Sequence, residues 1–520
     1  MLSGAFRLGP RARQPPSRWR RNSLSVRAHA SGANSAVNGA GFEGDSQHVI
    51  ARRESNMRLL LLNRPAALNA LSVNMIHLMT PQLKVWDESD ATKSILLTSI
   101  EGSRSFCAGG DVRAMLPAKS KKAADLAMAM KFIESEYRLN HLTGTLKKPY
   151  ISLMNGIAMG GGIGISVHGP FRIATENTLF SMPETNIGLF PDVGASFFLP
   201  RLDGELGTFL GLTSHRLQGV EVFLSGIATH YIPSKRIHAL LEILADLESD
   251  DLTDVNMALE KFSEPLSQDV WRKWSLGGEV ANAINRTFKF NTVEEIVDAL
   301  KKEDSEWANK TLKELEAVSP TSLKVTLEQL RRGKTLDFAS CFRQEYRMVQ
   351  GFLQGTDFFE GVTARLVEKR PPKWSHTLND LPNILHADIL RTYFDPFPPA
   401  PSKRAPNSTL PRERLDFLTP LTYFEYPHHT LSGLPTDRDV ESVISGRFRR
   451  GSGQSITLTK KQDVVNTFLS RWGGYDPGLV GTDAAKLPRV SNIDHGHGKG
   501  KKGLREKVVS ILERRVPTLQ

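Results

Sequence analysis

The 520-residue sequence contains only two cysteines, Cys107 and Cys341. Two cysteines cannot build the disulfide framework of small secreted domains, so we expect a reducing, intracellular compartment. The sequence also lacks an apolar run close to the roughly 20 residues that a membrane-spanning helix needs, so we expect no membrane partner. Its hydrophobic content of 40% and charged content of 24% are typical of a soluble globular protein.

Acidic residues are absent from the first 30 positions, which contain seven arginines. An Arg- and Ser-rich segment without acids, and without the apolar run of a secretory signal, is typical of a mitochondrial transit peptide; a disordered basic arm is the alternative. Small polar residues follow. We therefore predict a transit peptide over 1–30, a flexible linker over 31–47 and localisation in the mitochondrial matrix.

The net charge of +11 is concentrated at the two ends of the chain. Residues 1–30 contribute +7 and residues 401–520 contribute +8, which leaves −4 for the part between them. The slightly acidic middle needs no polyanionic partner to explain it.

Short apolar segments, among them predicted strands at 94–99, 150–154 and 171–174, alternate with helix-spaced segments after His48, which predicts an α/β domain over 48–397. Helical periodicity predominates between about 234 and 366, with helix-rich segments predicted at 236–248, 252–262, 293–316 and 320–332. The Pro-rich stretch at 398–406 predicts an extended linker, so we assign 398–520 to a linker and a basic C-terminal extension that ends in a helix near 503–515.

Two glycine-rich segments follow predicted strands, FCAGGD at 106–111 and the run Gly160–Gly162. Consecutive glycines lose much backbone entropy on folding, which favours a close approach of another group to the chain. One N–H from each segment would form an oxyanion hole. For FCAGGD alone, an ordinary tight turn is the alternative. Neither segment contains the GxxxxGK[ST] phosphate-binding motif.

Three acidic residues are candidates for acid–base chemistry. Glu184 and Asp192 lie in Pro- and Gly-containing loops, where a turn-forming role and a catalytic role are both open. Glu136 lies on the flank of the apolar face of a helix over 123–142, and this periodicity favours a side chain that reaches water over a buried functional carboxylate.

Other polar residues carry weaker signals. Cys107 has no histidine partner nearby in the sequence and is interpreted as a packing residue. His168 and Gly169 are expected to end the helix that follows the glycine run. His495 and His497 lie in a Gly/Lys-rich stretch and are too few for a metal site, so we expect no metal.

These motifs resemble the crotonase superfamily of acyl-CoA enzymes and, within it, the hydrolases that cleave 3-hydroxyisobutyryl-CoA in valine breakdown. The resemblance covers roughly 48–395 and is carried by NRPAALNAL at 63–71, FCAGGD at 106–111, GIAMGGGIGISVHG at 156–169, MPETNIGLFPDVG at 182–194, FLPRL at 198–202, GIATH at 226–230, DFFEGV at 357–362 and PKW at 372–374. It implies a ββα spiral core followed by a helical region.

The resemblance also implies roles for single residues. Gly110 and Gly161 match the loops whose amides bind the thioester oxygen, and Glu184 matches the acid/base glutamate of the superfamily. Glu136 and Asp192 match carboxylates that line the substrate site, together with Gly161 and Glu184. Whether Glu184 acts as a general base or as a nucleophile stays open. CoA would arrive as part of the substrate, so no separate cofactor is expected.

One position distinguishes members of the superfamily. The resemblance implies that enoyl-CoA hydratases have a second glutamate three residues after the oxyanion-hole glycine, which is Gly161 here. This chain has Gly164 at that position. The addition of water across a double bond by two carboxylates is therefore disfavoured. Hydrolysis of a thioester with Glu184 alone is still consistent with the sequence.

A second hypothesis comes from the extension, which the ordinary hydrolases lack. A hydrolase-like protein is known in the small subunit of fungal mitochondrial ribosomes. Residues 401–520 would then contact ribosomal RNA and small-subunit proteins through FRR at 448–450, KK at 460–461 and GKGKKGLREK at 498–507. A solvated basic tail is the alternative.

Overall fold

The computed structural model describes residues 47–396, 414–445, 460–472 and 501–515. Four expected features lie outside these residues: the transit peptide at 1–30, nearly all of the linker at 31–47, the Pro-rich stretch at 398–406 and the FRR motif at 448–450. The described parts of the core and of the C-terminal extension belong to one compact unit.

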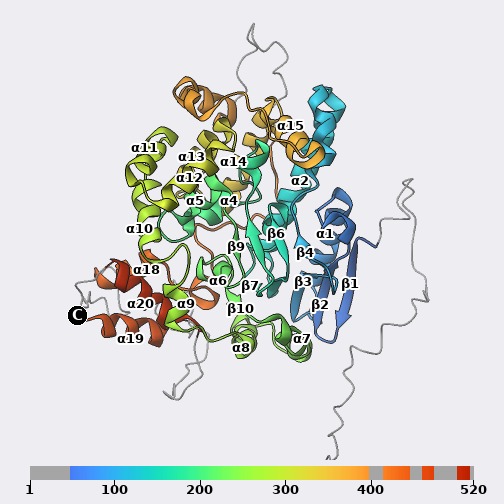
Figure 1. Ribbon diagram of the computed structural model, residues 1–520. Helices are drawn as coiled ribbons and strands as arrows, with labels where there is room; N and C mark the ends of the chain where they lie inside the picture. The colour runs from blue at the N-terminus through green and yellow to red at the C-terminus, as the bar shows by residue number, and fades with distance from the viewer. Residues whose placement is uncertain (1–46, 397–413, 446–459, 473–500, 516–520) are drawn as a thin grey trace, which may run out of the picture. The chain divides into compact units, whose positions relative to one another are not determined.

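Within the described residues, the strands form two sheets (Figure 1). The six-stranded sheet has the order β1-β2-β3-β5-β7-β10, with β1 antiparallel to β2 and the other neighbours parallel. The four-stranded sheet has the order β4-β6-β8-β9, with β9 antiparallel to β8. The strands are β1 Val49–Glu54, β2 Met57–Leu62, β3 Ser94–Ser99, β4 Ser105–Cys107, β5 Tyr150–Met154, β6 Ile157–Met159, β7 Phe171–Ala174, β8 Leu179–Ser181, β9 Leu217–Gln218 and β10 His230–Tyr231.

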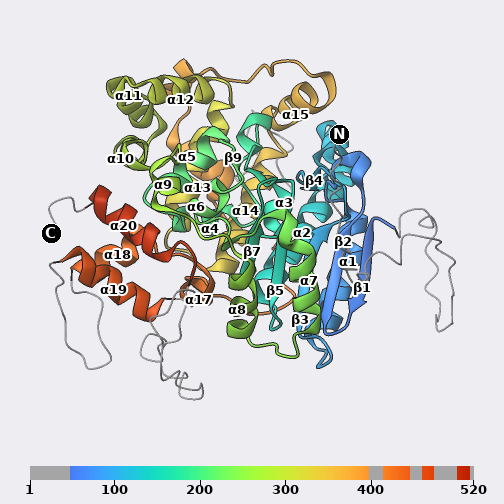
Figure 2. The ribbon, with the colours of Figure 1, turned by 60° about the horizontal axis from the view of Figure 1, so that its bottom comes forward.

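Helices cover both faces of the six-stranded sheet, which explains the four consecutive leucines, Leu59 to Leu62, of β2. All six residues of β2 are buried. Leu59 and Leu61 pack with α7 (Ile237–Asp246) and α8 (Leu252–Phe262), which lie across the sheet in Figure 2. Leu60 and Leu62 belong to the main core on the opposite face. Parallel strands that are buried on both faces are typically continuous apolar runs.

The remaining helices are α1 Val73–Asp87, α2 Ala123–Thr145, α3 Gly161–Gly164, α4 Ala195–Phe198, α5 Leu206–Thr213, α6 Glu221–Leu224, α9 Gln268–Arg272, α10 Gly278–Thr287, α11 Val293–Glu303, α12 Glu306–Glu316, α13 Pro320–Gly333, α14 Phe338–Phe352, α15 Asp357–Val362, α16 His386–Ile389, α17 His429–Ser432, α18 Asp437–Ile444, α19 Lys461–Arg471 and α20 Leu504–Arg515. Each described helix is too short or too polar to span a lipid bilayer.

Two helix boundaries differ from those predicted from the sequence. The helical stretch predicted over 293–316 is two helices, because Asp304 adopts a left-handed φ of 44° and the Ser305 side chain caps α12. The glycine-run helix α3 ends at Gly164. The prediction that His168 and Gly169 end this helix is therefore wrong.

The described part of the C-terminal extension packs on the core. Figures 1 and 2 show α18, α19 and α20 side by side next to α9 and α10. α20 buries the apolar side chains of Leu504, Val508, Ile511 and Leu512. A solvated tail would leave these side chains in water, so that interpretation is wrong for α20.

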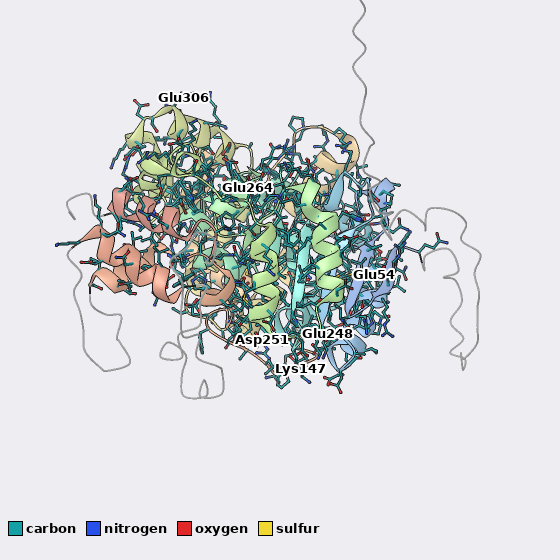
Figure 3. The ribbon with its side chains drawn as sticks, turned by 90° about the horizontal axis from the view of Figure 1, so that it is seen from below. Glu54, Lys147, Glu248, Asp251, Glu264 and Glu306 are labelled. Atoms are coloured by element: carbon teal, nitrogen blue, oxygen red, sulfur yellow. The ribbon has the colours of Figure 1, made fainter. Side chains whose placement is uncertain are left out.

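Buried ion pairs join the extension to the core. The Lys501 side chain is 1% exposed, and its Nζ lies 2.8 Å from Glu260 Oε1 and also donates to the Thr229 carbonyl. The ammonium group of Lys507 is paired with Asp203. These two lysines are therefore not available to phosphates, which corrects part of the GKGKKGLREK prediction. Ordinary charged side chains such as Lys147 and Glu306 are exposed at the edges of the view in Figure 3.

Lys501→Ala should destabilise the protein by about 2–3 kcal/mol, because it leaves the 13%-exposed Glu260 carboxylate without its cation. Urea denaturation at pH 7 measures this loss. Lys502→Ala is the matched control, since it removes the same charge from the next residue, whose backbone N–H alone contacts Glu260. Equal losses in the two variants would contradict the prediction.

Candidate active site

Two glycine loops meet beside the parallel strands β4 and β6. Gly110 follows β4, and Gly161 is the first residue of α3, which follows β6. A methyl group placed on Gly161 would lie 2.9 Å from the Gly110 amide nitrogen. Neither amide donates a hydrogen bond to another described residue. Two unpaired main-chain donors on adjoining loops are the groups from which an oxyanion site is built.

The glycine run is required by the close approach of two carboxylates. A Cβ on Gly161 would lie 2.3 Å from Glu136 Oε1, and a Cβ on Gly160 would lie 2.6 Å from Glu184 Oε1. Gly160 also has a left-handed φ of 45°. Any side chain at these positions would displace the acids, which is the physical reason for the glycines.

Three carboxyl groups surround the glycine loops. Glu136 extends from α2, Glu184 begins the short 3-10 helix η4 (Glu184–Ile187) after β8, and Asp192 lies in the loop before α4. Their exposed fractions are 2%, 6% and 6%. The interpretation of Glu136 as a flank residue that reaches water is therefore wrong. The structure brings together all five residues that the sequence nominated, Gly110, Glu136, Gly161, Glu184 and Asp192.

Burial raises the pKa of all three acids. Desolvation raises the pKa of Glu136 and of Glu184 well above the ordinary range, and the nearby Asp192 raises both further. Burial raises the pKa of Asp192 to about 6, opposed by a hydrogen bond from Tyr137. Glu136 Oε1 and Glu184 Oε2 have no hydrogen-bond partner among the described residues. Leaving a buried carboxyl oxygen without a partner costs free energy, so these two oxygens are candidates for contact with a substrate.

The loop that carries Asp192 is held in a strained conformation. Val193 has a φ of 53°, which is unfavourable for a β-branched residue. Glu345 accepts hydrogen bonds from the amides of Gly194 (2.7 Å) and Ser196 (2.8 Å). Burial raises the pKa of Glu345 to about 8, while these two bonds oppose the shift.

Three further side chains fix the same loop. Gln329 on α13 donates to the Pro191 carbonyl at 2.6 Å, and Tyr137 on α2 donates to Asp192 Oδ2 at 2.9 Å. His168 Nε2 lies 2.8 Å from the Val193 carbonyl oxygen. Several independent contacts therefore define where the Asp192 carboxylate points.

Sequence reasoning missed the residues that support the loop. Glu345 had a detectable signal, since it is an acid on the apolar face of α14, at helical spacing from Phe338, Cys341 and Phe342. An acid at a core position predicts a buried, bonded carboxylate. Tyr137 and His168 gave no such signal, because a tyrosine on an apolar face and a histidine beside a glycine are common in ordinary cores.

The position that holds a second glutamate in hydratases is closed in this chain. A Cβ on Gly164 would lie 2.5 Å from Asn140 Nδ2 and 2.6 Å from Val193 Cβ.

Cys107 is fully buried, and burial raises its pKa to about 12, as suits a packing residue. His495 and His497 lie outside the described residues, within which no group of three metal-ligating side chains occurs.

A sequence model of the enoyl-CoA hydratase/isomerase family matches residues 57–390. The chain belongs to the enoyl-CoA hydratase/isomerase, or crotonase, family. The mitochondrial 3-hydroxyisobutyryl-CoA hydrolase of Danio rerio is 46% identical over 327 residues, which cover 63% of this chain and 84% of that protein. The human hydrolase is 42% identical over 345 residues, covering 66% and 88%. Small ribosomal subunit protein mS47 of Neurospora crassa is 42% identical over 429 residues, covering 78% and 81%.

Solved structures of the crotonase family share the fold. A carnitinyl-CoA dehydratase from Mycobacterium thermoresistibile has a TM-score of 0.60 and 36% identity, covering 68% of this chain and 98% of that one. An enoyl-CoA hydratase from Rhodobacter sphaeroides has a TM-score of 0.58 and 31% identity, covering 67% and 97%. The predicted crotonase-like core followed by a helical region is confirmed.

Asp192→Asn should stabilise the folded protein at neutral pH. Because the pKa of Asp192 rises from 3.8 to about 6 on folding, its ionisation opposes folding. This penalty is absent below about pH 3.8 and complete above about pH 6. We expect the variant to gain about 2–3 kcal/mol at pH 7.5.

Urea denaturation of both proteins between pH 4 and 8 tests the sign. The isosteric control is Asp298→Asn on α11, where the side chain is 67% exposed, and it should show no gain that grows with pH. A destabilised Asp192→Asn protein at pH 7.5 would show that the carboxylate contributes more to folding than its burial costs.

Proposed function

We propose that the protein hydrolyses the thioester of 3-hydroxyisobutyryl-CoA to 3-hydroxyisobutyrate and CoA in the mitochondrial matrix, as part of valine catabolism. The observation that carries the proposal is the meeting of two unpaired amides, at Gly110 and Gly161, with the buried carboxyl of Glu184. The hydrolases named above, which are themselves mitochondrial, support the choice of substrate and compartment.

The amides of Gly110 and Gly161 bind the thioester oxygen, which becomes negative as the carbonyl carbon turns tetrahedral. Loss of one such donor typically lowers the rate ~10²–10³-fold. The C–S bond then breaks, the acyl carbon keeps the new C–O bond, and the CoA thiolate takes up a proton. CoA enters as part of the substrate, and the proposal requires no other cofactor.

Glu184 can bring about the attack on the carbonyl carbon in either of two ways. As a general base it takes a proton from a water molecule that attacks the carbonyl carbon. As a nucleophile it attacks that carbon itself, and water then cleaves the mixed anhydride. Both routes use ionised Glu184. Its raised pKa makes the carboxylate a stronger base, and the ionised fraction grows as the pH rises.

The other two acids suit a substrate with a hydroxyl group. Glu136 Oε1 lies beside Gly161 and has no partner among the described residues, so it is free to accept a bond from the hydroxyacyl end. Asp192 is oriented by Tyr137 and would bond the 3-hydroxyl or Glu184. The closed position at Gly164 disfavours hydration by two glutamates.

The test is a thioesterase panel that follows free thiol from 3-hydroxyisobutyryl-, 3-hydroxypropionyl- and crotonyl-CoA. We expect release from the two 3-hydroxyacyl substrates and little from crotonyl-CoA. Glu184→Gln should lower kcat about 10³-fold, because it removes the base or nucleophile without changing the side-chain size.

Glu176→Gln is the matched control, since Glu176 is exposed and bonds Ser234 instead. Its rate should equal that of the unmodified protein. A folded protein that releases no thiol at any substrate concentration, or a Glu184→Gln variant with an undiminished rate, would overturn the proposal.

A second candidate function is a component of the small subunit of the mitochondrial ribosome, with the hydrolase domain retained or vestigial. The match to mS47 favours it, because that match covers 78% of this chain, compared with 63% and 66% for the two hydrolases described above. The contacts would be made by residues 401–520 to ribosomal RNA and neighbouring proteins.

Sedimentation with small subunits in a series of salt concentrations tests this second function. Deletion of 414–515 would remove core packing, so the sharper variant neutralises exposed cations of the extension, namely Arg438, Lys460 and Arg505, by glutamine. We expect weaker co-sedimentation and a salt slope lower by up to about 3.

The matched control neutralises three exposed lysines of the core, Lys84, Lys301 and Lys302, and should leave co-sedimentation unchanged. Full-length protein that never migrates with small subunits at low salt would refute a ribosomal role.

A further inference from the structure

One segment of the extension packs directly behind the Asp192 loop. We call residues 414–428 the strap. Arg138 on α2 donates to the Asp416 carbonyl at 2.7 Å, and His141 Nε2 lies 3.0 Å from the Leu421 carbonyl oxygen. Tyr423 donates to the Gly144 carbonyl at 3.1 Å. The family match ends at residue 390, so the strap lies beyond the part of the chain that defines the family.

Tyr426 of the strap reaches a histidine that contacts the catalytic loop. Its hydroxyl lies 2.9 Å from His168 Nδ1, and His168 Nε2 lies 2.8 Å from the carbonyl oxygen of Val193. His168 is fully buried, among Phe198, Phe338 and Phe342. A continuous chain of two hydrogen bonds therefore runs from the extension to the residue next to Asp192.

The direction of each bond follows from the chemistry of the groups. Burial lowers the pKa of His168 to about 3, so the ring is neutral and carries one N–H. A carbonyl oxygen only accepts, so the N–H is on Nε2 and points to Val193. Nδ1 then has a lone pair that needs a donor, and the Tyr426 hydroxyl supplies it.

The chain ends where the backbone is strained. Val193 adopts a left-handed φ of 53°, a conformation that persists only where neighbours enforce it. The His168 N–H holds the Val193 carbonyl, while Glu345 and Gln329 hold the amides and carbonyl on either side. Release of His168 would let the Val193 peptide turn and would change the direction of the Asp192 side chain.

We propose that Tyr426 is a positioning residue for Asp192, acting through His168 and the Val193 carbonyl. The C-terminal extension would then contribute to the geometry of the active site. The catalytic consequence rests on the proposed hydrolase function. The hydrogen-bond chain itself does not, and it can be tested without substrate.

The strap provides a matched pair of variants, Tyr426→Phe and Tyr423→Phe. Each removes one hydroxyl from a partly buried ring, and the rings lie three residues apart in the same aromatic cluster. Tyr423 bonds the end of α2, whereas Tyr426 bonds His168. A merely structural role therefore predicts the same behaviour for the two variants.

We expect Tyr426→Phe to lower kcat on 3-hydroxyisobutyryl-CoA about tenfold with KM changed less than twofold, because Gly110, Gly161 and Glu136 keep their places while Asp192 alone is misdirected. Tyr423→Phe should keep both constants within twofold. The thermal unfolding midpoints of the two variants should agree within a few degrees. Equal kcat values for the two variants would overturn the proposal.

Nitrogen NMR of ¹⁵N-histidine-labelled protein tests the hydrogen-bond chain without substrate, with His168 assigned from a His168→Gln sample. The unmodified protein should show a protonated Nε2 and an Nδ1 that accepts a hydrogen bond. Tyr426→Phe should shift only Nδ1 toward a free imine, and Tyr423→Phe should shift neither. An unchanged Nδ1 signal overturns the positioning role, whereas the expected shifts in a protein without thioesterase activity would refute the proposed function alone.

Discussion

The site depends on burying three carboxyl groups around two main-chain amides. In a poorly solvated pocket these acids cannot all ionise, because each charge repels the others and has lost its hydration. Glu136, Glu184 and Asp192 therefore hold their protons to higher pH than acids in water do. The same burial that makes Glu184 a strong base opposes folding, so the rest of the core must offset it.

Elements that are far apart in the sequence together orient the Asp192 side chain. Tyr137 comes from α2, Gln329 from α13, Glu345 from α14, and Tyr426 from the strap by way of His168. Each supplies a hydrogen bond to the loop or to the group that holds it. A loop with a left-handed valine has an easy alternative conformation, and only simultaneous contacts of this kind make one geometry dominant.

Much of this arrangement follows from local sequence. The strands at 94–99, 150–154 and 171–174 and the helix at 252–262 were predictable, because apolar runs and periodicity set their bounds. The glycine loops and Glu184 were also predictable as chemistry-bearing residues. Periodicity predicted that the Glu136 side chain reaches water, whereas it is buried. Helix spacing shows which face of a helix a side chain is on, but not which other elements pack against that face. Glu345 and His168 support the loop through partners that are 151 and 25 residues away in the sequence. Such long-range pairings cannot be recognised in a single sequence.

The charge pattern has an internal explanation that the sequence alone did not reveal. The acidic middle of the chain and its basic end are complementary, and part of that complementarity is used within the molecule: Lys501 pairs with Glu260 and Lys507 with Asp203. The net charge of +8 over 401–520 therefore overstates what the extension offers to a nucleic acid. Among the described residues of the extension, an external partner would meet the cations left exposed, such as Arg438 and Arg505. Because the buried pairs fix the extension to the core, the proposed ribosomal contact through those cations would leave the strap in place behind Asp192. The two proposed functions are therefore compatible in one chain.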